Sequence, residues 1–194
     1  MAEEKISREH VIEATETALR RFGLAKISVV DVAKALKVSH GALYRHFDGK
    51  ADMVDAAIER WLDRLAGPLA VIAAEHGPAP ERMRRWFDVL IASQAAKAQN
   101  DPELFDAFRE LARRGGQAID VEVERRAAHL AKMLDDGMAQ GAFESADAGT
   151  TARAILDATA PFWRPEHAAE WRRPQAQARF DAVFRLVLRG LSAR

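Results

Sequence analysis

Two short amphipathic segments lie back to back between Ser28 and Lys50, in a stretch that reads SVVDVAKALKVSHGALYRHFDGK. Each opens with a residue that can cap a helix, Ser28 in the first and Ser39 in the second, because a serine oxygen accepts a hydrogen bond from the first helical turn. Asp31 places a carboxylate at the positive end of the first helix. Apolar pairs flank both caps at the spacing of a hydrophobic staple, namely Ile27 with Val32 and Val38 with Leu43. The spacing predicts two helices joined by a tight turn.

The second of these helices has a very thin apolar stripe. Leu43 and Phe47 are its only firm anchors, and the other residues are small or form hydrogen bonds: Ser39, His40, Gly41, Ala42, Tyr44, Arg45 and His46. A helix this short does not persist alone in water, so neighbouring helices must hold it while its polar residues face outward. This pattern is typical of a helix-turn-helix, in which the second helix enters the major groove of DNA.

Positive charge is concentrated in the same stretch, although the whole chain has a formal net charge of zero. Between Arg20 and Lys50 there are seven Lys or Arg residues and two Asp residues, a local balance of +5. Lys50 lies in the first turn of the next helix, where a cation opposes the helix dipole and a bound phosphate would relieve the conflict. We therefore expect a DNA-binding face that consists of Ser28, Lys37, Ser39, His40, Gly41, Ala42, Tyr44, Arg45, His46 and Lys50.

The run from Val32 to Met53, with VSHGALYRHFDGKADM at its centre, resembles the DNA-binding signature of the tetracycline-repressor (TetR) family. Tyr44, Phe47 and Lys50 at this spacing are the most specific part of the resemblance. One departure is Lys37, where the family usually has glycine; a left-handed lysine costs on the order of 1 kcal/mol. The resemblance implies a dimeric transcriptional regulator whose C-terminal helices bind an effector.

The remaining sequence predicts an all-α protein. Apolar residues recur at helical spacing in segments that begin or end at capping residues, glycines and prolines. We expect helices over residues 7–23, 80–100, 101–114, 117–140, 148–162 and 174–192. A further helix begins at Lys50 and either halts near Gly67 and Pro68 or resumes to about Glu75. Residues 1–50 then form a three-helix DNA-binding domain. A connecting helix joins it to a helical effector-binding and dimerisation domain over residues 51–194.

The last two predicted helices carry the residues expected at a dimer interface. Phe180, Phe184, Val187, Leu188 and Leu191 form one stripe, which Ile155, Thr159 and Phe162 can meet. From the residues alone, the stripe fits a monomer core equally well. The family resemblance implies that these helices pair with their copies in a homodimer, which would place two recognition helices in successive major grooves of a palindromic double-stranded operator.

Several large apolar residues in the C-terminal part are candidates to line an effector pocket. With two polar residues among them, the candidate set is Trp86, Leu90, Gln94, Phe105, Phe108, His129, Met133, Phe162 and Trp163. Pockets for small molecules are mostly apolar with a few polar groups, although ordinary core packing also explains each residue singly. The resemblance implies a small, mostly apolar effector.

The sequence lacks the usual signs of other functions. It has no cysteine, which excludes disulfides and thiolate metal sites, and it has no nucleophile elbow, phosphate-binding glycine loop or HExxH motif. We therefore expect no catalytic residues, metal or cofactor. No apolar run is long enough to span a bilayer and the first residues lack a signal-peptide pattern, so we expect a cytoplasmic protein without a membrane partner. The sequence favours a repressor that its effector releases from DNA; the alternative, a helical protein-binding adaptor, leaves the local +5 charge unexplained.

Overall fold

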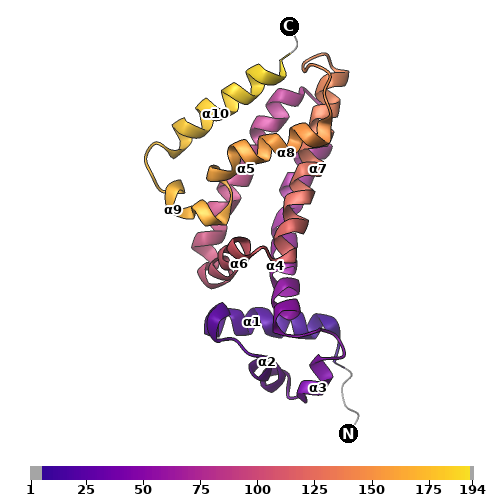
Figure 1. Ribbon diagram of the computed structural model, residues 1–194, viewed down its shortest axis with the longest axis vertical. Helices are drawn as coiled ribbons and strands as arrows, with labels where there is room; N and C mark the ends of the chain where they lie inside the picture. Colours follow the sequence, from indigo (N-terminus) through magenta and orange to yellow (C-terminus); the bar gives the residue numbers. More distant parts are fainter. Residues whose placement is uncertain (1–5, 193–194) are drawn as a thin grey trace. The chain divides into compact units, whose positions relative to one another are not determined.

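The computed structural model describes residues 6–192, and its regular elements are helices (Figure 1). The α-helices are α1 (Arg8–Lys26), α2 (Val29–Leu36), α3 (His40–Leu43), α4 (Lys50–Ala74), α5 (Ala79–Asn100), α6 (Pro102–Arg114), α7 (Gln117–Ala139), α8 (Ala148–Thr159), α9 (Ala168–Trp171) and α10 (Ala176–Leu191). Two 3₁₀ helices, Ala160–Phe162 and Pro165–His167, separate α8 from α9. Within residues 6–192 there is no β-strand, so the all-α prediction is confirmed.

The chain divides into two compact units. The first unit consists of residues 1–64 and 98–120, and the second consists of residues 65–97 and 121–194. The predicted functional boundary at residue 50 is a different kind of division and stays a prediction. The first five and last two residues of the predicted domains lie outside the described part of the chain.

In the first unit, α1 packs against α2 and α6. The Ser7 hydroxyl oxygen accepts a hydrogen bond from the His10 backbone N–H at 3.2 Å and caps α1 as the sequence predicts. Gly23 was expected to end this helix; it has a left-handed φ of 69° and bends the chain, but helical residues continue to Lys26. The buried Glu16 carboxylate accepts two hydrogen bonds from Arg64, at 2.8 and 2.7 Å, and ties α1 to α4.

The helix α2 begins with a capping box. The Asp31 backbone N–H donates to Ser28 Oγ at 3.3 Å, and the Ser28 backbone N–H donates to Asp31 Oδ2 at 2.9 Å. Hydrogen bonding by Ser28 lowers the pKa of the Asp31 carboxyl. The helix ends at Lys37, whose φ of 56° is the only positive value at a non-glycine residue in the described part of the chain. The expected tight turn is confirmed, and lysine occupies its left-handed position.

The helix α4 continues past the two residues where the sequence suggested a stop. Gly67 and Pro68 lie inside a helix that reaches Ala74, although proline removes a backbone hydrogen bond. Both residues face solvent, whereas Leu69 and Ile72 on the following turn are buried in the second unit. Burial of these side chains opposes the local preference of glycine and proline to end a helix.

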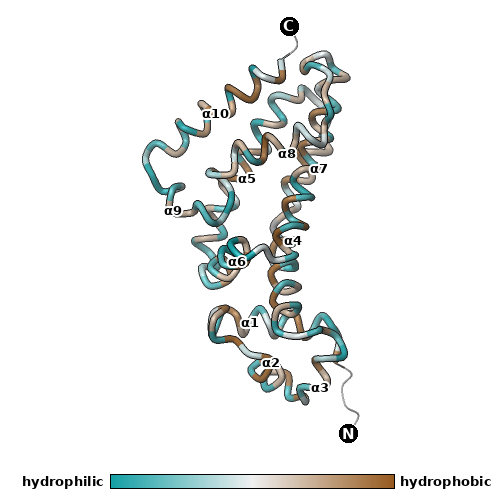
Figure 2. The backbone as a smooth tube through the Cα atoms, in the orientation of Figure 1, coloured by the Kyte–Doolittle hydropathy of each residue, from teal (hydrophilic) through white to brown (hydrophobic). Residues whose placement is uncertain are grey.

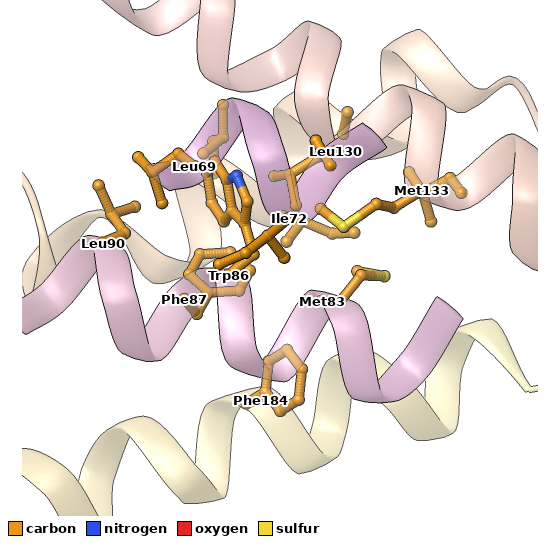
Figure 3. Close-up of a cluster of buried hydrophobic side chains, with 14 of the residues drawn as sticks. Leu69, Ile72, Met83, Trp86, Phe87, Leu90, Leu130, Met133 and Phe184 are labelled. Carbon is orange, nitrogen blue, oxygen red and sulfur yellow. The ribbon is translucent and has the colours of Figure 1, made fainter. Parts of the chain in front are cut away.

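The core of the second unit is a cluster of aromatic and aliphatic side chains (Figure 3). Trp86 and Phe87 of α5 meet edge to face, with ring centroids 5.0 Å apart. Phe87 also contacts Phe180 and Phe184 of α10, each at a centroid distance of 5.7 Å. The close-up shows Leu69 and Ile72 of α4 and Leu130 and Met133 of α7 gathered at the other side of Trp86. The cluster joins α4, α5, α7, α8 and α10 into one core.

The C-terminal segment is more broken than the sequence predicts. The expected helix over residues 148–162 ends as α-helix at Thr159 and tightens into a 3₁₀ turn that contains Pro161, and α10 begins at Ala176 instead of residue 174.

No helix in the described residues combines the length and apolar character needed to cross a membrane. Figure 2 shows hydrophilic residues interrupting each of the long helices.

Candidate DNA interface and effector region

Two buried anchors hold the segment that begins with α3. Leu43 is 1% exposed and Phe47 is 3% exposed, and the Arg8 guanidinium lies over the Phe47 ring, 4.9 Å from its centroid. Tyr44 between them is 57% exposed. Ser39, His40, Gly41 and Arg45 are exposed, while Ala42 and His46 are half-buried. Leu43 and Phe47 therefore fix the segment to the first unit, while its polar side chains face outward.

Packing within the described residues does not require glycine at position 41 of α3. A Cβ atom added at Gly41 would meet only Ser39 Oγ, at 3.9 Å, which is ordinary van der Waals contact. Gly41 also has no positive φ that would demand glycine. Because Gly41 has no side chain, another molecule can approach the backbone of α3 closely.

Two predicted DNA-binding residues have partners within the first unit. The Ser28 hydroxyl lies 2.6 Å from Asp31 Oδ2 in the capping box. Lys50 Nζ donates a hydrogen bond to the Leu24 backbone carbonyl at 3.0 Å, and the lysine is half-buried. Lys50 thus ties the start of α4 to the last turn of α1. An ammonium has three N–H donors, so the predicted phosphate contact of Lys50 stays a prediction.

The other basic residues of this region differ in exposure and partners. Lys37 and Arg45 are exposed, whereas Arg20 pairs with Asp101 at 2.8 Å. That pair raises the pKa of the Arg20 guanidinium. Arg20 is therefore already neutralised by a carboxylate, and the charge available to an anion is smaller than the local balance of +5 suggests.

The structure divides the predicted effector residues between the two units. Phe105 and Phe108 lie in the first unit, where Phe108 meets the Trp61 ring with centroids 6.0 Å apart. The other seven lie in the second unit: Trp86, Leu90, Gln94, His129, Met133, Phe162 and Trp163. All of these seven are buried except His129, which is half-buried. The division does not test their predicted role in a pocket.

Several polar atoms in the second unit are buried without a hydrogen-bond partner. They include both side-chain polar atoms of Gln94, the indole Nε1 of Trp86, Nδ1 of His129 and Nε of Arg126. Gln94 and Trp86 are 0% exposed. A buried polar atom without a partner destabilises a fold by about 1–3 kcal/mol, and native proteins contain few of them. Their concentration marks this region as more than apolar packing.

Buried charges lie beside these polar atoms and are not among the predicted effector residues. Lys97, Glu122 and Arg126 are each at most 5% exposed. Arg126 donates to Glu122 Oε1 at 2.8 Å, and its guanidinium lies 4.6 Å from the Trp163 ring centroid. A signal was available in the sequence, because Glu122 and Arg126 occupy the same helical stripe as Ile119, Leu130 and Met133.

Burial changes the ionisation of two groups in this region. Desolvation, with a further contribution from Arg126, lowers the pKa of Lys97 to about 8. Desolvation also lowers the pKa of His129, so burial favours the neutral imidazole. Charged groups at buried positions are destabilising unless they are paired, and clusters of perturbed groups are frequent at functional sites.

The predicted dimer stripe is only partly free for another chain. Ile155, Thr159, Phe162, Phe180 and Phe184 are buried within the second unit, as the monomer-core alternative requires. Val187, Leu188 and Leu191 are partly exposed. Leu186, which lies outside the predicted stripe, is 67% exposed. The outer half of α10 therefore presents apolar surface that the described residues do not cover.

Family models match both parts of the chain. Residues 11–57 match the family described as bacterial regulatory proteins, tetR family, and residues 79–184 match the tetracyclin repressor-like C-terminal domain. The first match contains the whole α2–α3 region and the start of α4. The second contains α5 to α9 and the first half of α10, which together cover more than half of the chain.

The chain is also similar to characterised regulators. It is 38% identical over 53 residues to the transcriptional regulator TtgR of Pseudomonas putida, a match that covers 27% of this chain and only 25% of TtgR. It is 27% identical to the transcriptional repressor KstR2 of Rhodococcus jostii over 96% of this chain and 91% of KstR2.

Solved structures share the fold along nearly the whole chain. A transcriptional regulator from Pseudomonas aeruginosa PAO1 superposes with a TM-score of 0.68 at 22% identity, covering 94% of this chain and 90% of that one. FadR from Bacillus subtilis, solved with stearoyl-CoA, has a TM-score of 0.66 at 17% identity, covering 95% of this chain and 100% of FadR. The adaptor alternative is not favoured by these matches. The chain belongs to the TetR family of DNA-binding transcriptional regulators.

Proposed function

We propose that this regulator is a repressor that binds a palindromic operator through the surface of α3 and leaves it when a small effector binds. The observation that carries the proposal is the segment from Ser39 to His46, whose polar and small residues face outward on the two buried anchors Leu43 and Phe47. The similarity to the repressor KstR2 over nearly the whole chain supports repression.

The side chains divide into two roles on DNA. Exposed Tyr44, Arg45 and Lys37 suit phosphate oxygens, which fix register without reading sequence. His40, together with the small residues Gly41 and Ala42 that permit close approach, suits base edges in the major groove. Ser39 and His46 are further candidates for either role, and Ser28 and Lys50 lie at the edge of this surface.

A homodimer explains how so small a reading surface gains specificity. The partly exposed Val187, Leu188 and Leu191 and the exposed Leu186 give α10 an apolar outer half, which supports pairing of α8 and α10 with their copies. Two recognition helices then read half-sites about 34–36 Å apart. Because this target is bacterial DNA, we infer a cytoplasmic location.

The effector acts through the part of the chain after residue 50. Its predicted site includes Trp86, Leu90, Gln94 and Met133, and the stearoyl-CoA bound by FadR supports a ligand with an apolar body. An effector releases DNA when it binds more tightly to a dimer whose recognition helices no longer match the half-sites. A saturating effector that leaves operator affinity unchanged would refute this mechanism.

The experiment measures binding of labelled duplexes from the region upstream of the gene by fluorescence anisotropy at two salt concentrations. We expect Arg45→Ala to weaken binding to all duplexes and to reduce the salt slope by about 1, because it removes a cation that contacts phosphate, while His40→Ala changes the preference among sequences. Arg113→Ala, at an exposed arginine of α6 outside both the α3 surface and the proposed dimer helices, is the control. Equal effects of both variants on all sequences would contradict the assigned roles, and no duplex binding by the wild type would contradict the function itself.

A further inference from the structure

The buried polar atoms of the second unit come from two helix faces that meet. On α5, Trp86, Leu90, Gln94 and Lys97 recur at intervals of four, four and three residues and so share one face. On α7, Glu122, Arg126, His129 and Met133 share a face in the same way. The Trp86 and His129 rings meet edge to face with centroids 6.2 Å apart, and at the other end Lys97 interacts electrostatically with Arg126 and Glu122. The two faces therefore run antiparallel.

Gln94 lies between these two ends. It follows Trp86 by eight residues, about 12 Å along a helix axis, and precedes Lys97 by about one turn. Its side chain is 0% exposed, and neither the amide nitrogen nor the amide oxygen has a hydrogen-bond partner. An amide that is buried without any partner is unusual in a native core. Gln94 shares the α5 face with Trp86, and His129 and Arg126 lie on the α7 face that meets it; each of these residues also has an unpartnered atom.

The chemistry of these atoms selects a ligand class. Three of these atoms are donors, namely the indole N–H of Trp86, the amide NH₂ of Gln94 and the N–H at Nε of Arg126, whereas Gln94 Oε1 is an acceptor. Buried Lys97 and Arg126 carry positive charge against the single buried carboxylate of Glu122 in this cluster. Excess donors and excess positive charge match a group that accepts hydrogen bonds and carries negative charge, as a carboxylate does.

A groove with aromatic walls contains the residue next to Trp163 in the chain. The Trp163 ring stacks on the Arg126 guanidinium, and the preceding residue, Phe162, lines a groove of about 190 Å³ together with Ile91, Trp171 and Phe180. An apolar cavity of ~150 Å³ is sufficient for a benzene molecule. The groove is therefore suited to a small aromatic or short aliphatic body. Arg173 also lines it and is the alternative cation, in place of Arg126, for binding an acidic ligand.

We infer that the effector of this regulator is a small monocarboxylic acid with an apolar body, and that Arg126 and Gln94 bind its carboxylate. This inference rests on the proposed function, since it names the chemical class of the effector. Lys97 contributes charge, and Trp86 and His129 offer further hydrogen bonds to the acid. The aromatic walls contact the apolar body.

The experiment compares acids with neutral molecules of the same shape. Binding of phenylpropanoate and octanoate, and of phenylpropanol and octanol, is followed by calorimetry and by tryptophan fluorescence on the full-length protein. We expect each acid to bind at least 10-fold more tightly than its alcohol, because a charge-assisted hydrogen bond contributes more than a neutral one. We expect Gln94→Leu to weaken acid binding about 10-fold and Arg126→Gln to abolish the preference for the acid.

Matched variants separate this site from the rim of the groove. Arg173→Gln is expected to leave acid affinity within about 3-fold of the wild type, because a solvent-exposed ion pair contributes little. Gln94→Leu changes no charge and keeps the test valid if Arg126→Gln does not fold. The inference is overturned if acids and alcohols bind alike, if neither acid binds, or if Arg173→Gln alone removes acid binding.

The same protein preparations are titrated with operator duplex, with and without acid. Failure to bind any duplex specifically would refute the proposed function. Specific duplex binding by a protein that binds neither acid would overturn the inference alone. Acid binding that discriminates against the alcohol but leaves the duplex bound would support the carboxylate site and contradict the release mechanism.

Discussion

Replacing Lys97 by methionine is expected to stabilise this protein at neutral pH. The lysine is 5% exposed, and desolvation is the main cause that lowers its pKa from 10.5 to about 8. At pH 7 the folded state therefore holds a buried charge that water would solvate better. A difference of about 2.5 pKa units corresponds to about 3 kcal/mol, which is an upper value for the gain. In a chain of this size, 1 kcal/mol shifts Tm by about 2–4 °C.

The stability gain of Lys97→Met is expected to depend on pH. Below pH 8 the lysine is protonated in both the folded and the unfolded state, so the wild type bears the full penalty. Between pH 8 and 10.5 the folded state releases its proton while the unfolded state keeps it, and wild-type stability rises with pH. The advantage of Lys97→Met must therefore be largest below pH 8 and shrink toward pH 10.5.

Thermal unfolding followed by circular dichroism between pH 6 and 10 measures this difference. Lys132→Met is the matched control, because Lys132 lies on the surface of the same unit in an ion pair with Asp136 at 3.2 Å; exposed ion pairs contribute about 0–1 kcal/mol. A lower Tm for Lys97→Met at pH 7, or an advantage that is the same at pH 6 and pH 10, would refute the reasoning.

Three further substitutions test local features of the fold, each by thermal unfolding. Lys37→Gly should stabilise the protein by up to about 1 kcal/mol, since glycine removes the left-handed strain at φ 56°; an unchanged or lower Tm would argue against strain. Ser28→Ala should destabilise it by about 1 kcal/mol by removing the cap on α2, and an unaltered Tm would mean that the capping box contributes nothing. Gly137→Ala should destabilise it by about 1–3 kcal/mol or more, because the new Cβ would overlap the Phe143 ring; a stable variant would show that the ring has room to move.

The helix-turn-helix was predictable because its signals are local. The Ser28 capping box, the short turn and the anchors Leu43 and Phe47 all depend on residues within a few positions of one another. The same is true of the glycine that ends α6 at position 115. Interactions across one or two helical turns can be inferred from residue order alone.

Features that depend on distant residues were not predictable in this way. Pro68 remains inside α4 because Leu69 and Ile72 are buried against residues far along the chain. The bond from Lys50 to the Leu24 carbonyl requires the folded first unit. The burial of Arg126 is not predictable from its residue type, because charged residues are usually solvated, whereas in the structure Arg126 is 2% exposed.

Hydrogen exchange of the protein bound to its operator tests whether the α3 surface contacts DNA. We predict that a specific duplex slows amide exchange across residues 39–46, where the backbone near Gly41 meets the groove, and that an unrelated duplex at the same salt concentration does so much less. Specific binding with unchanged exchange in residues 39–46, and protection elsewhere on the chain instead, would contradict it.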